Sequence, residues 1–246
     1  MVKEINQYWE NYKNIYSFEE ILRVYREKKV LGFLKSKKPE TILEIGCGFT
    51  PTFLKYNNFK RYILVEPGEK AYQNILEISK NDNRITCFNN FFEDVKDFTE
   101  ENFDYIIATG VLHETNTPQI FLKNIFKLMH NQSEVYINVP NANSFHRVLA
   151  KEMGLIKNVY EKSKRNLFLE QVSIFDKDSL EKIINETIPL VKIKECKSFF
   201  IKPFTHDQMM EGIKYNIFDD NLIDGLNNMS YHMPNLGCEL YCILSK

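Results

Sequence analysis

The sequence predicts an α/β fold, in which a seven-stranded and mostly parallel sheet carries helices on both faces. Short apolar and β-branched runs alternate with helical segments over the first 140 residues. A glycine-containing turn directly follows the first of these runs. A long insertion precedes the last apolar run, at residues 238–244, and this order predicts an antiparallel edge strand and helical lid or insertion segments.

Strands are expected at residues 41–45, 61–65, 84–88, 103–108, 134–139, 191–200 and 238–244. Helices are expected at residues 51–56, 118–130, 176–184, 205–213 and 218–229, with one more ending near residue 80 and mixed helix and loop at 147–172. At the first of these helices, Thr50 is the expected N-cap and Pro51 the expected first helical residue.

Length and composition limit the class of protein. The 246 residues suffice for one domain with a substantial insertion, and 43% hydrophobic with 26% charged residues is ordinary for a globular chain. The net charge of −1 provides no strong basic field, so no nucleic-acid partner is expected. The sequence shows no signal-peptide pattern and no apolar run of membrane-spanning length, which predicts a cytoplasmic protein without a membrane span. Nothing in it indicates an oligomeric state.

The five cysteines lie at positions 47, 87, 196, 238 and 242, and none of them forms a CxxC pair. Several lie in apolar runs that resemble strands, which favours reduced core thiols. The cysteines and the five histidines are dispersed and lack the spacing of metal ligands, so no metal site is expected.

The order of elements predicts a single domain, 1–246, with two functional halves. Residues 1–36 are expected to form lid helices ahead of the first strand, and Ser17-Phe-Glu-Glu20 is a capping box that would start the second of them. Aromatic residues before it, among them Tyr12, would either close as a lid over a flat ligand or pack the helix onto the sheet edge. Residues 40–140 are the expected cofactor-binding half, and residues 140–235 are the expected half for a second ligand.

The turn after the first strand carries the strongest chemical signal. Glu44-x-Gly46-x-Gly48 joins a buried strand to a helix start, and glycines there let the backbone approach a nucleotide closely. Glu66 ends the second strand 18 residues past Gly48, where a carboxylate can accept two hydrogen bonds from a ribose diol. Glu44 would either help to hold an ammonium group of the ligand or be buried and bonded to backbone.

This pattern resembles the class I S-adenosylmethionine-dependent methyltransferases, whose glycine motif is E-x-G-x-G-x-G. The similarity covers residues from about 40 to 140 and includes Phe103-Asp104 and Val111-Leu112-His113-Glu114, with Thr50 in place of the third glycine. It implies a Rossmann-like fold and S-adenosylmethionine as the cofactor, released as S-adenosylhomocysteine. The cofactor-binding residues expected on this basis are Glu44, Gly46, Cys47, Gly48, Glu66, Pro67, Phe92, Glu93, Thr109, Gly110 and Val111, with Tyr12 in the lid.

A nicotinamide (NAD(P))-binding oxidoreductase is the alternative from another reaction class. Its motif, G-x-G-x-x-G, would place the third glycine at Pro51, where proline cannot give the same close packing of helix on strand. Several spaced features agree with a methyltransferase, whereas the oxidoreductase depends on the glycine turn alone. A third alternative is a ligand-binding module without catalysis. It requires that the second half of the chain provide no site for a methyl acceptor.

Methyl transfer depends on alignment of acceptor and methyl carbon and on exclusion of water, and a hydroxyl acceptor can also need a base. His113, which follows the fourth strand, and His146, at the start of the insertion, are the candidate catalytic residues. Either could instead be a structural turn residue. The candidate acceptor-binding residues are Asn141, Asn143, Arg147 and Glu170. Of the two asparagines, one is expected to form an Asx turn and the other to contact the acceptor.

The second half resembles a narrower subgroup of methyltransferases, encoded with bacterial surface-glycan genes. The resemblance rests on residues 139–147, Met153-Gly-Leu-Ile156, Ile201-Lys-Pro-Phe204 and Asp207-Gln-Met209. It implies polysaccharide biosynthesis and O-methylation of a polar small molecule, such as a sugar, a nucleotide-sugar or a phosphorylated glycan precursor. The core also resembles ubiquinone-pathway enzymes, so a quinone or lipid-like acceptor is the alternative, although the polar cluster after Pro140 argues against a purely apolar acceptor.

Overall fold

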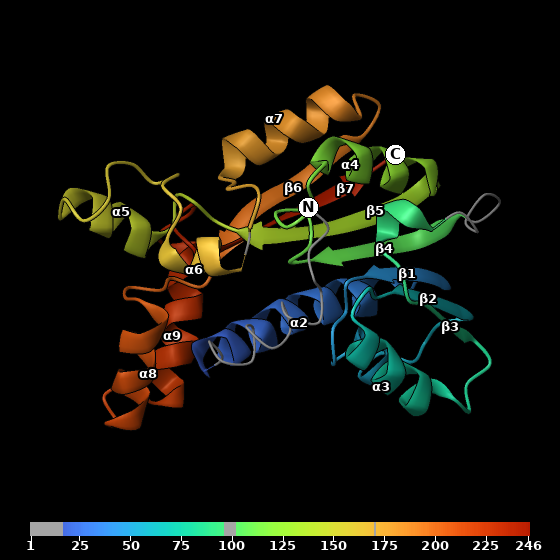
Figure 1. Cartoon of the computed structure of the whole chain (residues 1–246), viewed down its shortest axis with the longest axis horizontal. Helices are drawn as coiled ribbons and strands as arrows, with labels where there is room; N and C mark the ends of the chain where they lie inside the picture. Colours follow the sequence, from blue (N-terminus) through green and yellow to red (C-terminus); the bar gives the residue numbers. More distant parts are fainter. Residues whose placement is uncertain (1–16, 96–101, 170) are drawn as a thin grey trace.

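A computed structural model of the chain describes residues 17–95, 102–169 and 171–246. Seven strands form one sheet in the order β3-β2-β1-β4-β5-β7-β6, and helices pack around it (Figure 1). The strands are β1 (Thr41–Ile45), β2 (Arg61–Val65), β3 (Ile85–Phe88), β4 (Phe103–Thr109), β5 (Met129–Pro140), β6 (Lys192–Phe199) and β7 (Glu239–Ser245). The predicted Rossmann-like fold class is confirmed.

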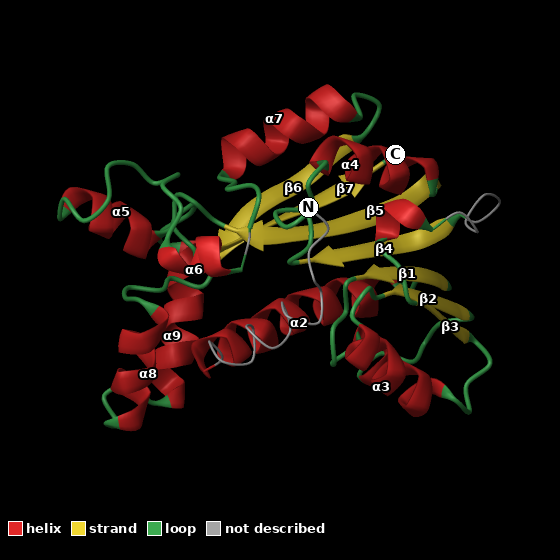
Figure 2. Cartoon of the chain, in the orientation of Figure 1, coloured by secondary structure: helices red, strands yellow, loops and turns green. Residues whose placement is uncertain are grey.

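The described helices fall close to their expected positions (Figure 2). They are α2 (Ser17–Lys37), α3 (Glu69–Ser79), α4 (Pro118–Lys127), α5 (Phe145–Glu152), α6 (Lys164–Phe168), α7 (Lys177–Thr187), α8 (His206–Lys214) and α9 (Asp220–Asn228). Among the helices of these described segments, none has the length and apolar character that a bilayer span requires.

The antiparallel strand lies one position in from the edge of the sheet. β7 runs antiparallel to both of its neighbours, β5 and β6, and β6 is the edge strand. Every residue of β7 is buried, whereas β6 alternates exposed and covered positions over most of its length. The apolar strand β7 therefore lies between two other strands, because a neighbouring strand on each side shields it from water.

The sheet separates two apolar layers, and side chains alternate between them along each strand. On β4, Ile106 and Ala108 join the layer that α4 and α7 cover. Tyr105 and Ile107 point to the opposite layer, which α2 covers together with residues of α8 and α9. This arrangement places the amino-terminal half of α2 beside α8 and near the carboxyl ends of the strands (Figure 1).

Two local predictions are wrong. The segment at 51–56 holds only a 3-10 turn, Thr52–Leu54, and its N-cap is Pro51 rather than Thr50. The chain has little length for a helix there, because it must return to the start of β2 at Arg61. The helix predicted at 118–130 ends at Lys127, and His130 belongs to β5, where its Nε2 lies 3.0 Å from Asp104 Oδ1.

The prediction of five reduced cysteines is also wrong for one pair. Cys196 on β6 and Cys242 on β7 are direct cross-strand partners and form a disulfide. The antiparallel register of the last two strands brings them together across 46 positions of the sequence. Cys47, Cys87 and Cys238 are free thiols.

Candidate active site

A cavity of about 1550 Å³ lies at the carboxyl ends of β1, β2 and β4 and extends to α2, α5, α6 and the start of α8. Two regions of its wall matter for the chemistry. The glycine-turn side is lined by residues that include Gly46, Gly48, Glu66, Phe92, Thr109 and Val111. The insertion side is lined by residues that include Glu19, His146, Arg165, Lys202, His206 and Glu239.

The glycine turn is packed directly against the loop after β4. Gly46 and Gly48 have φ angles of +70° and +59°, in the left-handed region that glycine enters without strain. A Cβ atom at Gly46 would lie 2.6 Å from Val111 Cγ2. The Gly46 N–H donates to the Val65 carbonyl at 2.8 Å. The turn therefore depends on glycine for both its conformation and its close contact.

Glu66 is buried at the end of β2 and is held by the backbone on both sides. Its Oε2 accepts the Gly48 N–H at 2.9 Å, and its Oε1 accepts the Gly68 N–H at 2.8 Å. Each carboxylate oxygen can accept more than one hydrogen bond. Since Glu66 and Pro67 also line the cavity, this carboxylate is oriented at the wall where a ribose is expected.

Glu44 is buried and supports the segment after the turn. It accepts the Thr52 hydroxyl at 2.6 Å, the Thr52 N–H at 3.0 Å and the Tyr62 hydroxyl at 2.8 Å. Burial raises the pKa of Glu44, and the hydrogen bonds from Thr52 and Tyr62 oppose that rise. Of the two expected roles, these contacts match the buried, backbone-bonded one, although Glu44 also lines the cavity.

The other expected cofactor residues also lie along the glycine-turn side. Phe92 packs edge-on against Phe121, with ring centroids 5.1 Å apart, and the carboxylate of Glu93 accepts the Thr115 hydroxyl at 2.7 Å. The Gly110 N–H donates to the Asn138 carbonyl at 2.9 Å. The hydroxyl oxygen of Thr109 is buried and has no hydrogen-bond partner among the described residues. Cys47 lines the wall as well, and burial, with Glu44 and Glu66, raises the pKa of its thiol.

Arg23 was missed by the sequence analysis. It lies on α2, lines the cavity, and its Nη1 is 3.4 Å from the Thr50 hydroxyl at the glycine turn. Its guanidinium also bonds Glu20 and Glu27 on the same helix. No local pattern marks this residue, because its approach to the turn depends on where α2 packs.

His113 and His146 lie at different parts of the wall. His113 is 5% exposed, its Nε2 is 3.6 Å from Glu114 Oε1, and its carbonyl accepts the N–H groups of Val172 and Ser173. The Nδ1 of His146 is buried without a hydrogen-bond partner in the described part of the chain. Burial lowers the pKa of His146 well below its usual value, and the charges of Lys202 and Arg147 add to that effect. His146 is therefore a neutral imidazole at neutral pH.

Three of the predicted acceptor residues are described, and only Arg147 lines the large cavity. Its Nε donates to the Val159 carbonyl at 2.8 Å, and its Nη2 donates to the Glu161 carbonyl, so it also holds the loop after α5. Asn141 donates to the carbonyls of Asn235 and Gly237, and its Oδ1 accepts the Asn143 N–H in an Asx turn.

Neither asparagine is among the described residues that line the large cavity, but Asn141 lines a small pocket that shares His113 and Arg147 with it. The acceptor contact expected of one asparagine stays a prediction. Tyr12 and Glu170 lie outside the described residues. Within the ranges that are described, no group of three or more His, Cys, Asp or Glu side chains could hold a metal ion.

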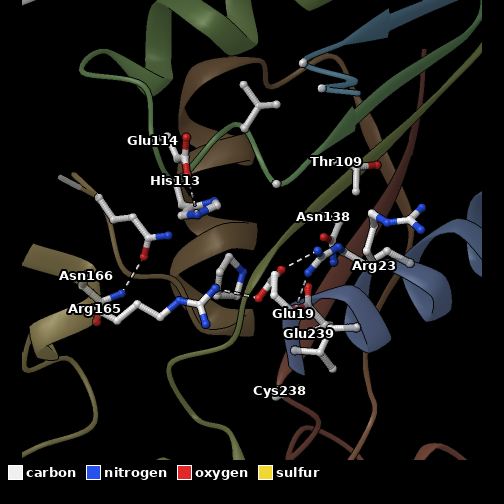
Figure 3. A pocket seen from close by; sticks show the side chains of 18 of the residues that line it. Glu19, Arg23, Thr109, His113, Glu114, Asn138, Arg165, Asn166, Cys238 and Glu239 are labelled. Atoms are coloured by element: carbon white, nitrogen blue, oxygen red, sulfur yellow. Dashed lines mark hydrogen bonds and ion pairs between the residues drawn. The ribbon is translucent and has the colours of Figure 1, made fainter. Parts of the chain in front are cut away.

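The insertion side contains a buried charged cluster that the sequence analysis did not assemble. We define the charged cluster as Glu19, Arg26, Arg165, Lys202, His206 and Glu239. Arg26 bonds Glu19 at 2.5 Å and Glu239 at 2.9 Å, while Arg165 bonds Glu19 at 2.7 Å. Figure 3 shows Glu19, Glu239 and Arg165 around the same pocket as His113 and Thr109.

The pKa directions follow from these contacts. Burial alone would raise the pKa of Glu19, but Arg26, His206 and Arg165 together hold it well below its ordinary value. Burial raises the pKa of Glu239, and Arg26 opposes that rise. Burial lowers the pKa of Lys202 to about 8 and that of His206 to about 4. At neutral pH, Lys202 is therefore mostly charged and His206 neutral.

The fold is that of a class I S-adenosylmethionine-dependent methyltransferase. The family model Methyltransf_23, described as a methyltransferase domain, matches residues 15–187. The chain therefore belongs to this methyltransferase family. No curated protein sequence matches the chain.

Solved methyltransferase structures share the fold. The plantazolicin methyltransferase BamL, in complex with a triazolic desmethylPZN analog and SAH, has a TM-score of 0.62 at 14% identity, covering 99% of this chain and 94% of that chain. The N-methyltransferase NodS from Bradyrhizobium japonicum WM9 has a TM-score of 0.55 at 14% identity, and the match covers 91% of this chain and 96% of that chain. NodS in complex with S-adenosyl-l-homocysteine (SAH) has a TM-score of 0.54 at 15% identity, and the match covers 90% of this chain and 86% of that chain.

Proposed function

We propose that this chain transfers the methyl group of S-adenosylmethionine to a polar small-molecule acceptor. The observation that carries the proposal is that one continuous cavity joins the glycine-turn side to the charged insertion side. Donor and acceptor bound on these two sides would meet in one cavity, where their alignment and the displacement of water accelerate the transfer. The family match supports the reaction class, and the SAH bound to similar structures supports the donor.

The glycine-turn side would hold the cofactor. Glu66 would accept the ribose hydroxyls, because Gly48 and Gly68 orient its carboxylate at the cavity wall. Phe92 and Glu93 would border the adenine, and the 109–111 segment would lie behind the methionine group. Arg23 would pair with the methionine carboxylate, since it is a cation beside the turn. Glu44 would act mainly by holding Thr52 in place.

The insertion side would hold the acceptor, and its charged cluster favours a polar one, although Leu149, Met153 and Leu155 line the cavity as well. The charged cluster places ionic side chains where a quinone or lipid-like molecule would need an apolar wall. O-methylation of a sugar, a nucleotide-sugar or a phosphorylated glycan precursor agrees with this wall. His146 would serve as the general base for a hydroxyl, because its imidazole is neutral and its Nδ1 has no hydrogen-bond partner within the described ranges.

Calorimetric titration tests the assigned cofactor. The purified protein is titrated with SAH and, separately, with NADH, and we expect saturable binding of SAH alone. Glu66→Gln should weaken SAH binding by roughly tenfold or more, because it removes charge from the carboxylate that would accept the ribose hydroxyls. Glu77→Gln, an exposed change on α3, is the matched control and should bind SAH as the wild type does.

Two outcomes would contradict the proposal. Saturable binding of NADH without binding of SAH would favour the oxidoreductase alternative. Wild-type SAH affinity in Glu66→Gln would remove Glu66 from the ribose site. The acceptor is then sought by incubating the protein with S-adenosylmethionine and individual sugars, nucleotide-sugars and sugar phosphates, and measuring the SAH released.

A further inference from the structure

Lys202 is a buried cation that forms no ion pair with a described carboxylate, although the nearby charges of Glu19 and Glu239 favour its protonated form. Its side chain lines the insertion side of the cavity, and the residue is 2% exposed. The polar contact of its ammonium group in this part of the chain is His206 Nδ1, at 3.2 Å. An ammonium group has three N–H donors, so this contact leaves two of them for a ligand.

His206 orients Lys202 but cannot neutralise it. The Nε2 of His206 lies 3.3 Å from Glu19 Oε2, which makes Nε2–H the donor and leaves Nδ1 to accept from Lys202. The carboxylate of Glu19 is already shared with Arg26 and Arg165. Glu239 is bonded to Arg26 as well. Both carboxylates favour the charged form of Lys202 without forming an ion pair with it, and neither is paired with Lys202 alone.

Arg165 contributes further free donors on the same side of the cavity. Its Nη2 bonds Glu19 at 2.7 Å, while its Nη1 is buried and has no partner in the described ranges. Lys202 and Arg165 are thus joined through one chain of contacts, Lys202 to His206 to Glu19 to Arg165. Two cations on the wall of one cavity, both with unused donors, form a surface that would attract an anionic group.

The geometry points to a subsite in which Lys202 and Arg165 bind an oxyanion group, a phosphate or a carboxylate, that the methyl acceptor carries. This inference rests on the proposed function, since it assigns the second ligand of the methyltransferase cavity. A neutral hydroxyl would leave the ammonium group of Lys202 without an ion-pair partner, whereas an oxyanion would pair with it directly and accept the unused N–H donors. The carboxylate of the cofactor is a separate anion, expected at Arg23 on the glycine-turn side.

Anion titration of the SAH-saturated protein tests the subsite. SAH fills the glycine-turn side, so an added anion reports on the insertion side. The probes are inorganic phosphate and acetate, titrated by calorimetry at constant ionic strength against a chloride blank. Lys202→Gln and Arg165→Gln should each weaken binding of the probe by about tenfold or more, as the loss of a charge-assisted contact predicts. Lys157→Gln, an exposed change in the same insertion, is the matched control.

The outcomes separate this inference from the proposed function. Saturable phosphate binding that depends on both cations supports a phosphorylated acceptor, and acetate binding in its place supports a carboxylate. Absence of saturable binding of either probe, or binding that survives both substitutions, overturns the subsite.

SAH affinity should remain within about twofold in all three variants. If SAH does not bind the wild type, the proposed function fails, and titration of the unliganded protein still tests the subsite. Thermal melting confirms that each variant is folded, and Arg165→Gln keeps the test open if Lys202→Gln does not fold.

Discussion

Gly46 and Val111 lie so close together that a Cβ atom at position 46 would be 2.6 Å from Val111 Cγ2. This contact joins the turn after β1 to the loop after β4, two segments separated by β2, β3 and β4 in the sequence. The glycine-turn side of the cavity is therefore shaped by backbone packing as well as by the side chains that line it.

Gly46→Ala should reduce both stability and cofactor affinity. The added methyl group would collide with Val111, and an alanine at a φ of +70° is strained. We expect a loss of roughly 1–3 kcal/mol in the free energy of unfolding and at least about tenfold weaker SAH binding. Urea unfolding and calorimetry measure these quantities.

Gly32→Ala is the control for this change. Gly32 lies within α2, and a Cβ atom there would meet no atom within 4 Å. Alanine should stabilise the helix by up to about 1 kcal/mol and leave SAH affinity unchanged. Equal effects of the two substitutions would show that the contact with Val111 does not shape the site.

Arg23→Gln should discriminate between ligands that differ in one carboxylate. If Arg23 pairs with the methionine carboxylate, the substitution should weaken SAH binding by about tenfold or more. It should not affect binding of S-adenosyl-3-thiopropylamine, the decarboxylated analogue of SAH. Lys35→Gln, an exposed change on the same helix, controls for loss of positive charge. Equal weakening of both ligands would place the role of Arg23 in the fold instead.

His146→Gln should lower turnover without changing cofactor affinity. We expect kcat for a hydroxyl acceptor to fall by about 100-fold, the usual contribution of a general base, while the Kd of SAH stays constant. Because the pKa of His146 is lowered by burial, its basic form persists across neutral pH, and wild-type kcat should not fall between about pH 8 and about pH 6. His113→Gln is measured in parallel, and an unchanged kcat removes the substituted residue as the base.

Asp104 should make the stability of the fold depend on pH. Burial alone would raise its pKa, but the backbone N–H groups of Thr41 and Glu40, each at 2.8 Å, and the side chain of His130 hold it below its ordinary value. A carboxylate with a lowered pKa stabilises the fold above its unfolded-state pKa of about 3.9, and this contribution is lost as pH falls through the folded-state pKa.

Asp104→Asn should therefore destabilise the protein by roughly 1 kcal/mol near neutral pH, and by less below about pH 4. Urea unfolding at both pH values measures the difference from the wild type. Glu77→Gln, on the exposed face of α3, should show no such dependence. If the difference in unfolding free energy between Asp104→Asn and the wild type is the same at the two pH values, the charge of Asp104 is not its source.

Much of the fold could be predicted because the signals are local. The apolar runs of β1, β2 and β4 and the glycines after β1 are read from consecutive residues, and they led directly to Glu66. The start of β5 could not be read in this way, because Met129-His-Asn-Gln-Ser133 is largely polar. It becomes a strand through contacts with β4, where the Ser133 hydroxyl donates to the Phe103 carbonyl and His130 lies beside Asp104.

The sequence alone determined the order of the elements, the glycine turn and the carboxylate that ends β2, since apolar periodicity and backbone conformation depend on neighbouring residues. Only the tertiary structure decided the insertion side of the cavity. Glu19 meets His206 across 187 positions, and Arg26 meets Glu239 across 213. Such contacts leave no local pattern, because each charged residue looks like an ordinary surface residue until packing buries it beside its partner.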